Sequence, residues 1–330
     1  MIKILIGGSP CTFWSIAQKK HRETAATGQG WELFKNYLIA KEKFKPDFFL
    51  YENNKSAAEE IKAQIRQELG VTSGAAHYIE IDSALLSAQN RKRFYVYNGA
   101  NCQQPQDANI KLQNILQQGK FANVGEVETV KKNIPKIAKK KGYLPEFFNP
   151  YNASEITDKA PTLSTGSMVT SSCATLKFER QDDGKYEVKN GFIYYGGAVY
   201  PTTLADGFYI IRQLTVAECC RLQTLSDDYC RVVSNSQAHK ALGRGWTAAV
   251  IIHILSTILK DIPRSEEIIV LSMYDGIGTG RYCFEKMGFT NIKYFAYEID
   301  ERAKAIAQSN FPDIIQRGDA FAVREKNWHL

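Results

Sequence analysis

The 330-residue chain lacks several features that would place it in a specialised class of protein. No apolar run reaches the length of a bilayer span, and the first residues lack the basic start and small-residue cleavage site of a secretory signal. The sequence contains no internal repeat and no low-complexity tract. These absences argue against a membrane-spanning, secreted, repetitive or disordered protein, so a cytoplasmic globular protein is expected.

The chain also lacks the cysteine spacing of a zinc site or a disulfide framework. Its seven cysteines are an odd number without a C-x-x-C pair, at positions 11, 102, 173, 219, 220, 230 and 283. We therefore expect reduced thiols and no bound metal. The net charge is modest, because 42 Lys and Arg against 35 Asp and Glu give +7, which favours a polyanionic partner without requiring one.

Alternating strand and helix patterns occupy both ends of the chain. Strands are predicted at 2–6, 48–51, 78–81, 93–97, 268–274, 292–298 and 314–317, and helices at 31–43, 56–69, 215–222, 245–259, 280–287 and 301–310. This alternation predicts an α/β fold with a mostly parallel sheet covered by helices. Short strands rich in Pro, Gly and Asn between them indicate a smaller lobe, so we divide the chain at 1–98, 99–207 and 208–330.

A glycine-rich loop near the end of the chain predicts a nucleotide-type cofactor site. The segment Asp275-Gly276-Ile277-Gly278-Thr279-Gly280 places three glycines where an apolar strand becomes a helix, which lets the backbone approach a ligand closely. A structural tight turn would explain this loop equally well on its own. Glu298 ends the next strand, where an acid commonly binds ribose hydroxyls, and Asp319 follows the third. Polar residues at three successive strand ends favour an adenosine cofactor.

A second turn, near the start of the chain, has the features of a nucleophile turn. Cys11 follows Gly7-Gly8-Ser9-Pro10 directly after a strand, and Glu52 ends the next apolar strand. A lone cysteine is more often an inert core residue. A thiol and a carboxyl on neighbouring strand ends nevertheless suit a nucleophile with an acid partner. Because most cofactor enzymes have the cofactor loop first, the reversed order suggests a chain whose ends have moved.

Seven blocks of the sequence together resemble the DNA cytosine carbon-5 methyltransferases. They cover most of the chain outside the lobe, at 8–11, 52–54, 89–93, 212–218, 221–223, 242–247 and 275–280. In that family the cofactor loop precedes the nucleophile block, so the resemblance implies a circular permutation between the third cofactor strand and the nucleophile strand. The usual Glu-Asn-Val reads Glu52-Asn53-Asn54 here. Arg244-Gly245-Trp246 resembles the animal de novo branch, whereas many bacterial members carry Asn at the first of these positions.

The resemblance implies a fold, a cofactor and a reaction. The fold is a doubly wound, Rossmann-like methyltransferase sheet with a small irregular target-recognition lobe, and the cofactor is S-adenosylmethionine. The substrate is cytosine flipped out of duplex DNA. The Cys11 thiolate would add to carbon 6 while protonated Glu52 donates to ring nitrogen 3, and Arg91 and Arg93 would serve the pyrimidine oxygen and the active-site carboxyl. The alternative is that both arginines are surface charges at a strand edge, although the Gln-x-Arg-x-Arg spacing favours a functional role for Arg93. The implied cofactor contacts are Pro10, Arg244, Gly245, Trp246, Asp275, Gly276, Ile277, Gly278, Thr279, Glu298, Ile299 and Asp319.

Three further stretches could meet nucleic acid. Residues 12–30, with Lys19, Lys20, His21 and Arg22, suit a mobile lid, although an ordinary loop would have the same composition. Six lysines gather between positions 131 and 141, where phosphate binding and a solvated face are equally plausible. The Pro-Thr-Leu turn within residues 159–166 is similar to one that precedes the recognition region in bacterial and phage members.

Two other readings of the sequence stay open. A tRNA cytosine methyltransferase has the same fold and thiol chemistry, and a DNA-binding homologue without turnover would keep the fold alone. Arg244 also raises the hypothesis of a carboxylated cofactor analogue, whose anionic group a cation beside the cofactor could bind. Phage, restriction-modification and regulatory settings all fit these features, and neither the target sequence nor the oligomeric state can be read from them.

Overall fold

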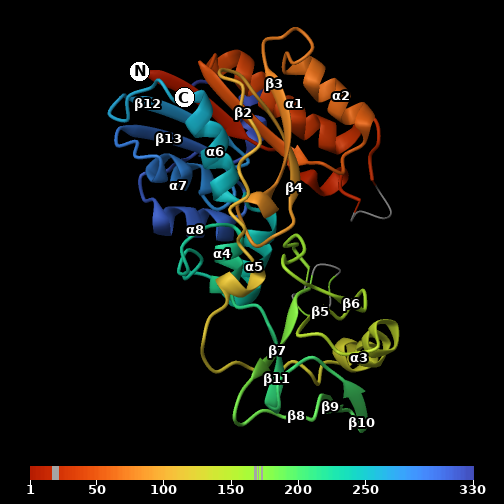
Figure 1. Ribbon diagram of the computed structural model, residues 1–330. Helices are drawn as coiled ribbons and strands as arrows, with labels where there is room; N and C mark the ends of the chain where they lie inside the picture. The colour runs from red at the N-terminus through yellow and green to blue at the C-terminus, as the bar shows by residue number, and fades with distance from the viewer. Residues whose placement is uncertain (17–21, 167–168, 170, 172–173) are drawn as a thin grey trace.

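Two seven-stranded sheets organise the computed structural model, which describes residues 1–16, 22–166, 169, 171 and 174–330 (Figure 1). The first sheet has the order β14-β13-β12-β1-β2-β4-β3. Every neighbouring pair from β14 to β2 is parallel, whereas β4 is antiparallel to both of its neighbours. Its strands are β1 (Ile2–Gly7), β2 (Phe48–Asn54), β3 (His77–Asp82), β4 (Lys92–Tyr97), β12 (Ile268–Met273), β13 (Ile292–Tyr297) and β14 (Ile315–Gln316).

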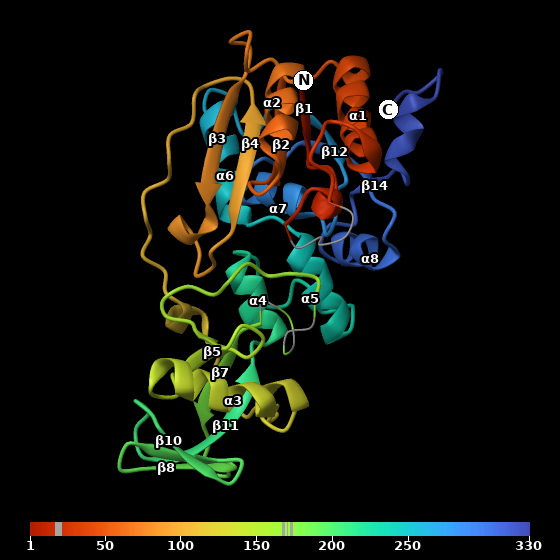
Figure 2. The same cartoon turned by 90° about the vertical axis from the view of Figure 1, so that its right-hand side faces the viewer.

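Helices cover both faces of this sheet, as the apolar pattern predicts. Ile4 and Ile6 of β1 belong to one hydrophobic cluster and Leu5 to the other, so side chains alternate between two buried faces. On the Leu5 face lie α1 (Gly28–Phe44), α2 (Glu59–Glu68) and the 3-10 helix η4 (Ala320–Arg324). On the other face lie α6 (Ala248–Ile258), α7 (Thr279–Lys286) and α8 (Glu301–Asn310) (Figure 2). This confirms the α/β fold and the mostly parallel sheet.

The strand order of the first sheet resembles that of a doubly wound sheet when the strands are numbered from β12. If β12 is counted first and β1 follows β14, the order becomes 3-2-1-4-5-7-6. This is the doubly wound order 3-2-1-4-5-6 with one strand inserted before the last. Ligands of such sheets bind at the carboxyl ends of strands where the winding reverses, which here is between β12 and β1. The predicted cofactor loop follows β12, and Cys11 follows β1.

The two ends of the chain lie at the same end of this domain, away from the second sheet (Figures 1 and 2). Lys3 donates to the carbonyl of Phe44, at the end of α1. The neighbouring Lys43 donates to the carbonyl of Glu325, six residues after Asp319, at 2.7 Å. The end of α1 therefore contacts both terminal segments.

The second sheet is antiparallel, in the order β10-β9-β8-β11-β7-β5-β6. Its strands are β5 (Phe147–Asn149), β6 (Ser154–Glu155), β7 (Leu176–Arg180), β8 (Tyr186–Lys189), β9 (Phe192–Tyr195), β10 (Ala198–Pro201) and β11 (Gly207–Gln213). One face packs on α3 (Glu128–Lys141), whose Val130, Ile134 and Ile137 share a core with Phe148 and Phe178. Strand β11 lies inside this sheet, between β8 and β7, and extends from Gly207 to Gln213. The sheet therefore includes residues beyond position 207, where we expected the lobe to end.

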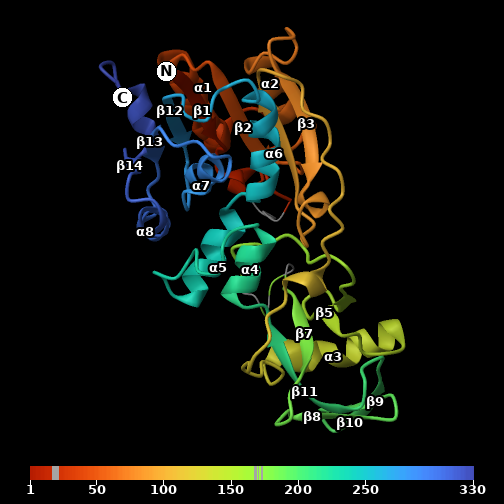
Figure 3. The same cartoon turned by 60° about the vertical axis from the view of Figure 1, so that its left-hand side comes forward.

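The second sheet leads into helices that lie between it and the first sheet (Figure 3). A buried ion pair joins the second sheet to the first of these helices. Arg212, at the end of β11, pairs with Glu218 at 2.8 Å and with Glu179 of β7 at 2.8 Å. Glu218 lies in α4 (Val216–Leu222), which begins with the capping box predicted at Thr215. Separating Arg212 from Glu218 would leave a buried charge without its partner, which is costly. The pair therefore holds the end of β11 against the start of α4.

By length and composition, one stretch of the described chain resembles a membrane span, at 235–258. It comprises two helices, α5 (Asn235–Arg244) and α6, separated by Gly245–Thr247. The apolar side chains of α6, including Ile251, Ile254 and Leu255, are buried in the core under the first sheet. The stretch is therefore explained as a core helix preceded by a polar one.

Candidate active site

The turn after β1 places Cys11 at the carboxyl edge of the sheet. Strand β1 ends at Gly7, and the short 3-10 helix η1 (Cys11–Phe13) starts at the cysteine, which is partly exposed. In the parallel pairing of β1 with β2, Gly7 lies beside Tyr51. Glu52, the residue after Tyr51, is therefore at the same edge of the sheet as the turn. A Cβ on Gly8 would lie 2.5 Å from the Glu52 carbonyl oxygen, and only glycine lets this turn approach β2 so closely.

A buried polar network supports the turn from below. The Asn53 amide donates to the Ser9 carbonyl at 2.9 Å and to the Tyr51 hydroxyl at 2.9 Å. The Ser9 and Tyr51 hydroxyls are 2.8 Å apart. All three side chains are buried, and burial raises the pKa of the Tyr51 phenol. The network fixes Ser9, and hence the position of Cys11; the sequence predicted the turn but not the tyrosine beneath it.

The Glu52 carboxylate accepts one N–H donor on each oxygen. Arg93 Nε lies 2.9 Å from Oε1, and Trp246 Nε1 donates to Oε2 at 2.9 Å. The Glu52 and Arg93 side chains are only 12% and 9% exposed, so these charged contacts are largely shielded from water. Arg93 therefore contacts the carboxyl as predicted for it. Trp246 is hydrogen-bonded to the candidate acid, and its predicted contact with the cofactor stays a prediction.

Arg91 is buried and ties three separate segments together. Its guanidinium donates to the carbonyls of Leu163, Gly243 and Gly245, the last at 2.7 Å. Burial, with the Arg93 charge nearby, lowers the pKa of Arg91. All of these hydrogen bonds go to main-chain carbonyls. Its predicted role at the pyrimidine oxygen stays a prediction.

The glycine-rich loop meets Glu298 where β12 and β13 end. Gly276 N donates to Glu298 Oε2 at 2.9 Å, and the amides of Ile299 and Asp300 donate to Oε1 at 2.8 Å each. Tyr274, just before the loop, has a φ of 60°, a left-handed conformation that is unusual for a tyrosine and concentrates at functional sites. A sequence carries no direct sign of that backbone conformation.

Two buried oxygens in the loop have no partner among the described residues, Asp275 Oδ2 and Thr279 Oγ1. Such atoms are costly unless a ligand satisfies them, so the loop fits a bound polar cofactor. The other Asp275 oxygen accepts from the Tyr294 hydroxyl at 2.6 Å. Burial raises the Asp275 pKa to about 6, from an ordinary value of 3.8. Tyr294 was not predicted as part of this site.

The remaining predicted cofactor residues lie around this loop. Ile299 is 69% exposed. Asp319 is also exposed and caps η4 through the amide of Phe321. Arg244, at the end of α5, forms an ion pair with Asp300 at 3.1 Å, two residues after Glu298. The loop itself contains five of the predicted residues, Asp275, Gly276, Ile277, Gly278 and Thr279. Pro10 directly precedes Cys11, and Gly245 directly precedes Trp246.

The segment after Cys11 is described only in part. Lys19, Lys20 and His21 of the predicted lid lie outside the described residues. Arg22 donates to the Trp14 and Ser56 carbonyls. Glu23 accepts from the indole of the buried Trp14 and from the amide of Gly30. The described end of the segment is thus bound to the domain beside the nucleophile turn.

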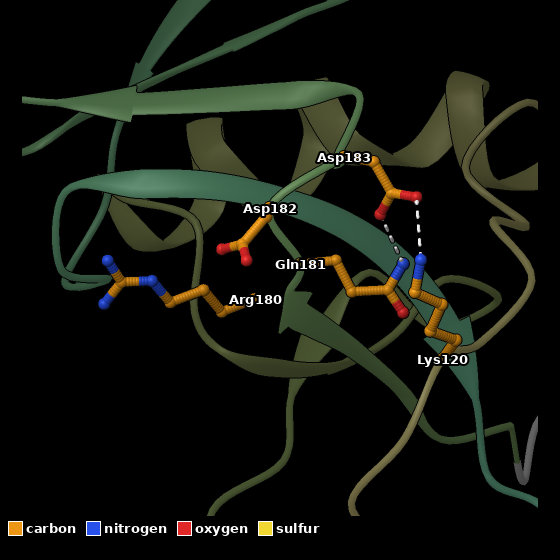
Figure 4. Close-up of a pocket in the computed structure, with 5 residues that line it drawn as sticks. All are labelled: Lys120, Arg180, Gln181, Asp182 and Asp183. Carbon is orange, nitrogen blue, oxygen red and sulfur yellow. Dashed lines mark hydrogen bonds and ion pairs between the residues drawn. The ribbon is translucent and has the colours of Figure 1, made fainter.

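Other potential sites in the described chain are weaker. A shallow hollow at the turn between β7 and β8 is lined by Lys120, Arg180, Gln181, Asp182 and Asp183 (Figure 4). It mixes both charges and contains none of the predicted site residues. The described residues contain no group of three His, Cys, Asp or Glu side chains suited to a metal ion. The carboxyl edge of the first sheet is therefore the candidate active site.

The buried carboxyl of Asp275 makes a prediction about stability and pH. Because its pKa is raised to about 6, its contribution to folding is fully present below about pH 4 and is lost as the pH rises through about 6. Asp275→Asn should therefore stabilise the cofactor-free protein at pH 8 by about 1–3 kcal/mol, and by little at pH 4.

Denaturant unfolding at the two pH values measures this difference. Asp182→Asn, at an exposed carboxyl far from the loop, is the matched control and should change neither value. We also expect Asp275→Asn to weaken cofactor binding, since the variant replaces an unpaired acceptor by an amide. An equal effect at pH 4 and pH 8 would contradict the account of this carboxyl.

Comparisons with known proteins bear on this arrangement. The sequence profile of the family described as C-5 cytosine-specific DNA methylase matches residues 1–260. Comparison with curated protein sequences gives no match. Among solved structures, a mutant of DNMT2 from Spodoptera frugiperda matches with a TM-score of 0.46 and 12% sequence identity, over 78% of this chain and 79% of that chain. The profile match includes the turn with Cys11 and the contacts of Glu52, and it ends before the glycine-rich loop.

Proposed function

Because this chain belongs to the C-5 cytosine-specific DNA methylase family, we propose that it methylates carbon 5 of cytosine in duplex DNA. Members of this family are methyltransferases that use S-adenosylmethionine. The observation that carries the proposal is the meeting of three parts at one sheet edge. Cys11 follows β1, Glu52 lies near the end of the neighbouring β2, and the loop with unpaired Asp275 and Thr279 oxygens follows β12 on the other side.

In the proposed reaction, the chain's own residues activate the cytosine ring. The Cys11 thiolate forms a bond to carbon 6, and protonated Glu52 gives its proton to ring nitrogen 3, so carbon 5 becomes nucleophilic. The bound cofactor supplies an electrophilic sulfonium methyl group. After transfer, loss of the carbon-5 proton and of the cysteine sulfur restores the aromatic ring. Arg93 orients Glu52 throughout.

The residues available to hold S-adenosylmethionine are those around the glycine-rich loop. We propose that Asp275 and Thr279 offer their unpaired oxygens and that Glu298 faces the ribose hydroxyls. Arg244 does not favour a carboxylated analogue, because Asp300 already pairs with its guanidinium and would repel a second carboxylate. The ordinary methyl donor is therefore the expected cofactor.

Transfer of labelled methyl groups tests the function directly. The protein is incubated with S-adenosylmethionine and either mixed-sequence duplex DNA or bulk tRNA, and the modified nucleosides are identified by mass. We expect 5-methylcytosine in the duplex and none in the tRNA. Label in tRNA alone would replace DNA by RNA as the substrate, and label in neither would leave a binding protein without turnover.

A lysine row on α3 supports a polyanionic partner. Lys132, Lys136, Lys139 and Lys140 are exposed on the side of the helix opposite its apolar core residues, and in the described part of the chain no carboxylate pairs with them. Lys131 and Lys141 on the same helix pair with Glu126 and Glu155. We propose that the four unpaired lysines contact DNA phosphates.

The salt dependence of DNA binding tests this row. Each phosphate contact contributes about 0.9 to the slope of log K against log salt, so Lys132→Gln with Lys136→Gln should reduce the slope by about 1.8. The matched control is Lys131→Gln with Lys141→Gln, which removes the same charge from the same helix at sites already paired. Equal slopes for both double variants would contradict the proposal.

We also propose that the chain is a circular permutant of its family. The strand order counted from β12, the contact of both terminal segments with the end of α1, and a family match that ends before β12 all support this. A chain reopened between α6 and β12, with Leu330 joined to Met1 by a short Gly/Ser linker, should fold and keep methyl transfer. Failure of this chain to fold would contradict the proposal.

A further inference from the structure

The hydrogen bond from Trp246 to Glu52 joins residues 194 positions apart in the sequence. An indole N–H can donate but never accept, so this bond holds Glu52 Oε2 in one orientation. Arg93 holds the other oxygen at 2.9 Å. Together the two donors fix the plane of the carboxyl that would protonate the base.

The loop that carries Trp246 is itself fixed on both sides. Gly245, the preceding residue, accepts from buried Arg91 at 2.7 Å. Thr247, the following residue, is buried and bonds Gln223 Oε1 and the Ser83 hydroxyl, each at 2.9 Å. The indole therefore has a preset position, which a side chain on a loose loop would lack.

The same loop also reaches the cofactor edge. Arg244 pairs with Asp300, which adjoins the Glu298 segment, while Trp246, two residues on, bonds Glu52. Two residues of one short segment thus contact the cofactor side and the base side of the site. The described contacts of the Trp246 N–H are with the base side alone.

We infer that Trp246 is a positioning residue for Glu52, acting on base activation rather than on cofactor binding. The inference rests on the proposed function and deepens it. It assigns to Trp246 a role that differs from the cofactor contact predicted from the sequence. Arg91 is then the anchor of the loop that presents the indole.

Hydrogen exchange at carbon 5 isolates base activation from methyl transfer. When Cys11 sulfur adds to carbon 6 and Glu52 protonates nitrogen 3, carbon 5 can take up a solvent proton. Loss of the original carbon-5 hydrogen as a proton and of the sulfur then restores cytosine, so tritium at carbon 5 passes into water without any cofactor. This readout depends on Glu52 but not on S-adenosylmethionine.

The test compares Trp246→Phe with Trp328→Phe. The first keeps an aromatic ring and removes the N–H on Glu52, and the second removes an indole N–H bonded to Tyr297 near the chain end. We expect Trp246→Phe to slow cofactor-free tritium release about tenfold or more, with the KM for S-adenosylmethionine within about threefold of wild type. Trp328→Phe should release tritium at the wild-type rate.

A double-mutant cycle separates this role from a structural one. In a Glu52→Gln background, Trp246→Phe should cause little further loss, because the carboxyl on which it acts is gone. An equal loss in both backgrounds, or wild-type release with a raised KM for S-adenosylmethionine, would overturn the inference. A wild-type protein with neither tritium release nor methyl transfer would instead overturn the proposed function.

Discussion

Replacing Cys11 by serine should lower methyl transfer on the order of 10⁴-fold or more, because a serine hydroxyl is a far weaker nucleophile than a thiolate at neutral pH. The substitution exchanges one sulfur for oxygen at a partly exposed position, where η1 begins. The turn itself depends on Gly8, Ser9 and Asn53, which are unchanged. The folded structure should therefore survive.

Initial rates with labelled S-adenosylmethionine and duplex DNA measure this effect. The unfolding midpoint and the affinity for DNA should stay within the error of the wild-type values. Cys102→Ser, at a buried thiol outside the site, controls for the general effect of losing a cysteine and should leave transfer nearly intact. Undiminished transfer by the Cys11 variant would remove the nucleophile from this account.

Replacing Glu52 by glutamine should lower kcat by about 10²–10⁴-fold, the usual contribution of a general acid. The loss has a second physical cause. Both Glu52 oxygens accept N–H donors, from Arg93 and from Trp246, so a glutamine must turn its own NH₂ toward one of them. The amide is then both unable to protonate the base and poorly oriented.

Single-turnover rates separate this chemical step from binding. The KM for S-adenosylmethionine should change little, because the glycine-rich loop follows β12 rather than β2. Glu80→Gln, on β3 in a partly buried ion-pair cluster with Lys55 and Lys62, is the matched control and should keep the wild-type kcat. A kcat within a few-fold of wild type for Glu52→Gln would exclude this residue as the acid.

The sequence predicted the parts of the site that lie on strand ends. Cys11 and Glu298 follow apolar strands, and Glu52 lies near the end of another. Parallel strands deliver their carboxyl ends to one edge of the sheet. The order of the strands follows from the same rule once the chain is counted from β12. These features depend on local patterns and on topology alone.

The parts that were missed depend on contacts between distant residues. Neither the bond from Trp246 to Glu52 nor that from Tyr294 to Asp275 has a signal in local spacing. Arg91 gives a similar lesson, since a charged residue in a motif block proved to be buried against three carbonyls. Only tertiary packing decides which group such a donor meets.

Two helices could have been found from the sequence. Ser234 and Gln237 form a capping box at the start of α5, and their spacing of three residues is visible in the sequence. In α3, Val130, Ile134 and Ile137 have helical spacing, but Pro135 inside the helix and the lysines around it concealed this pattern.

The most direct measurement of the central claim is the mass of the covalent adduct with a mixed-sequence duplex containing 5-fluorocytosine. Fluorine leaves no proton at carbon 5, so after methyl transfer the sulfur at carbon 6 cannot be eliminated and the protein stays bound to DNA. We expect an adduct that forms only with S-adenosylmethionine and maps to the peptide containing Cys11. An adduct at another cysteine, or active enzyme without any adduct, would contradict covalent catalysis by Cys11.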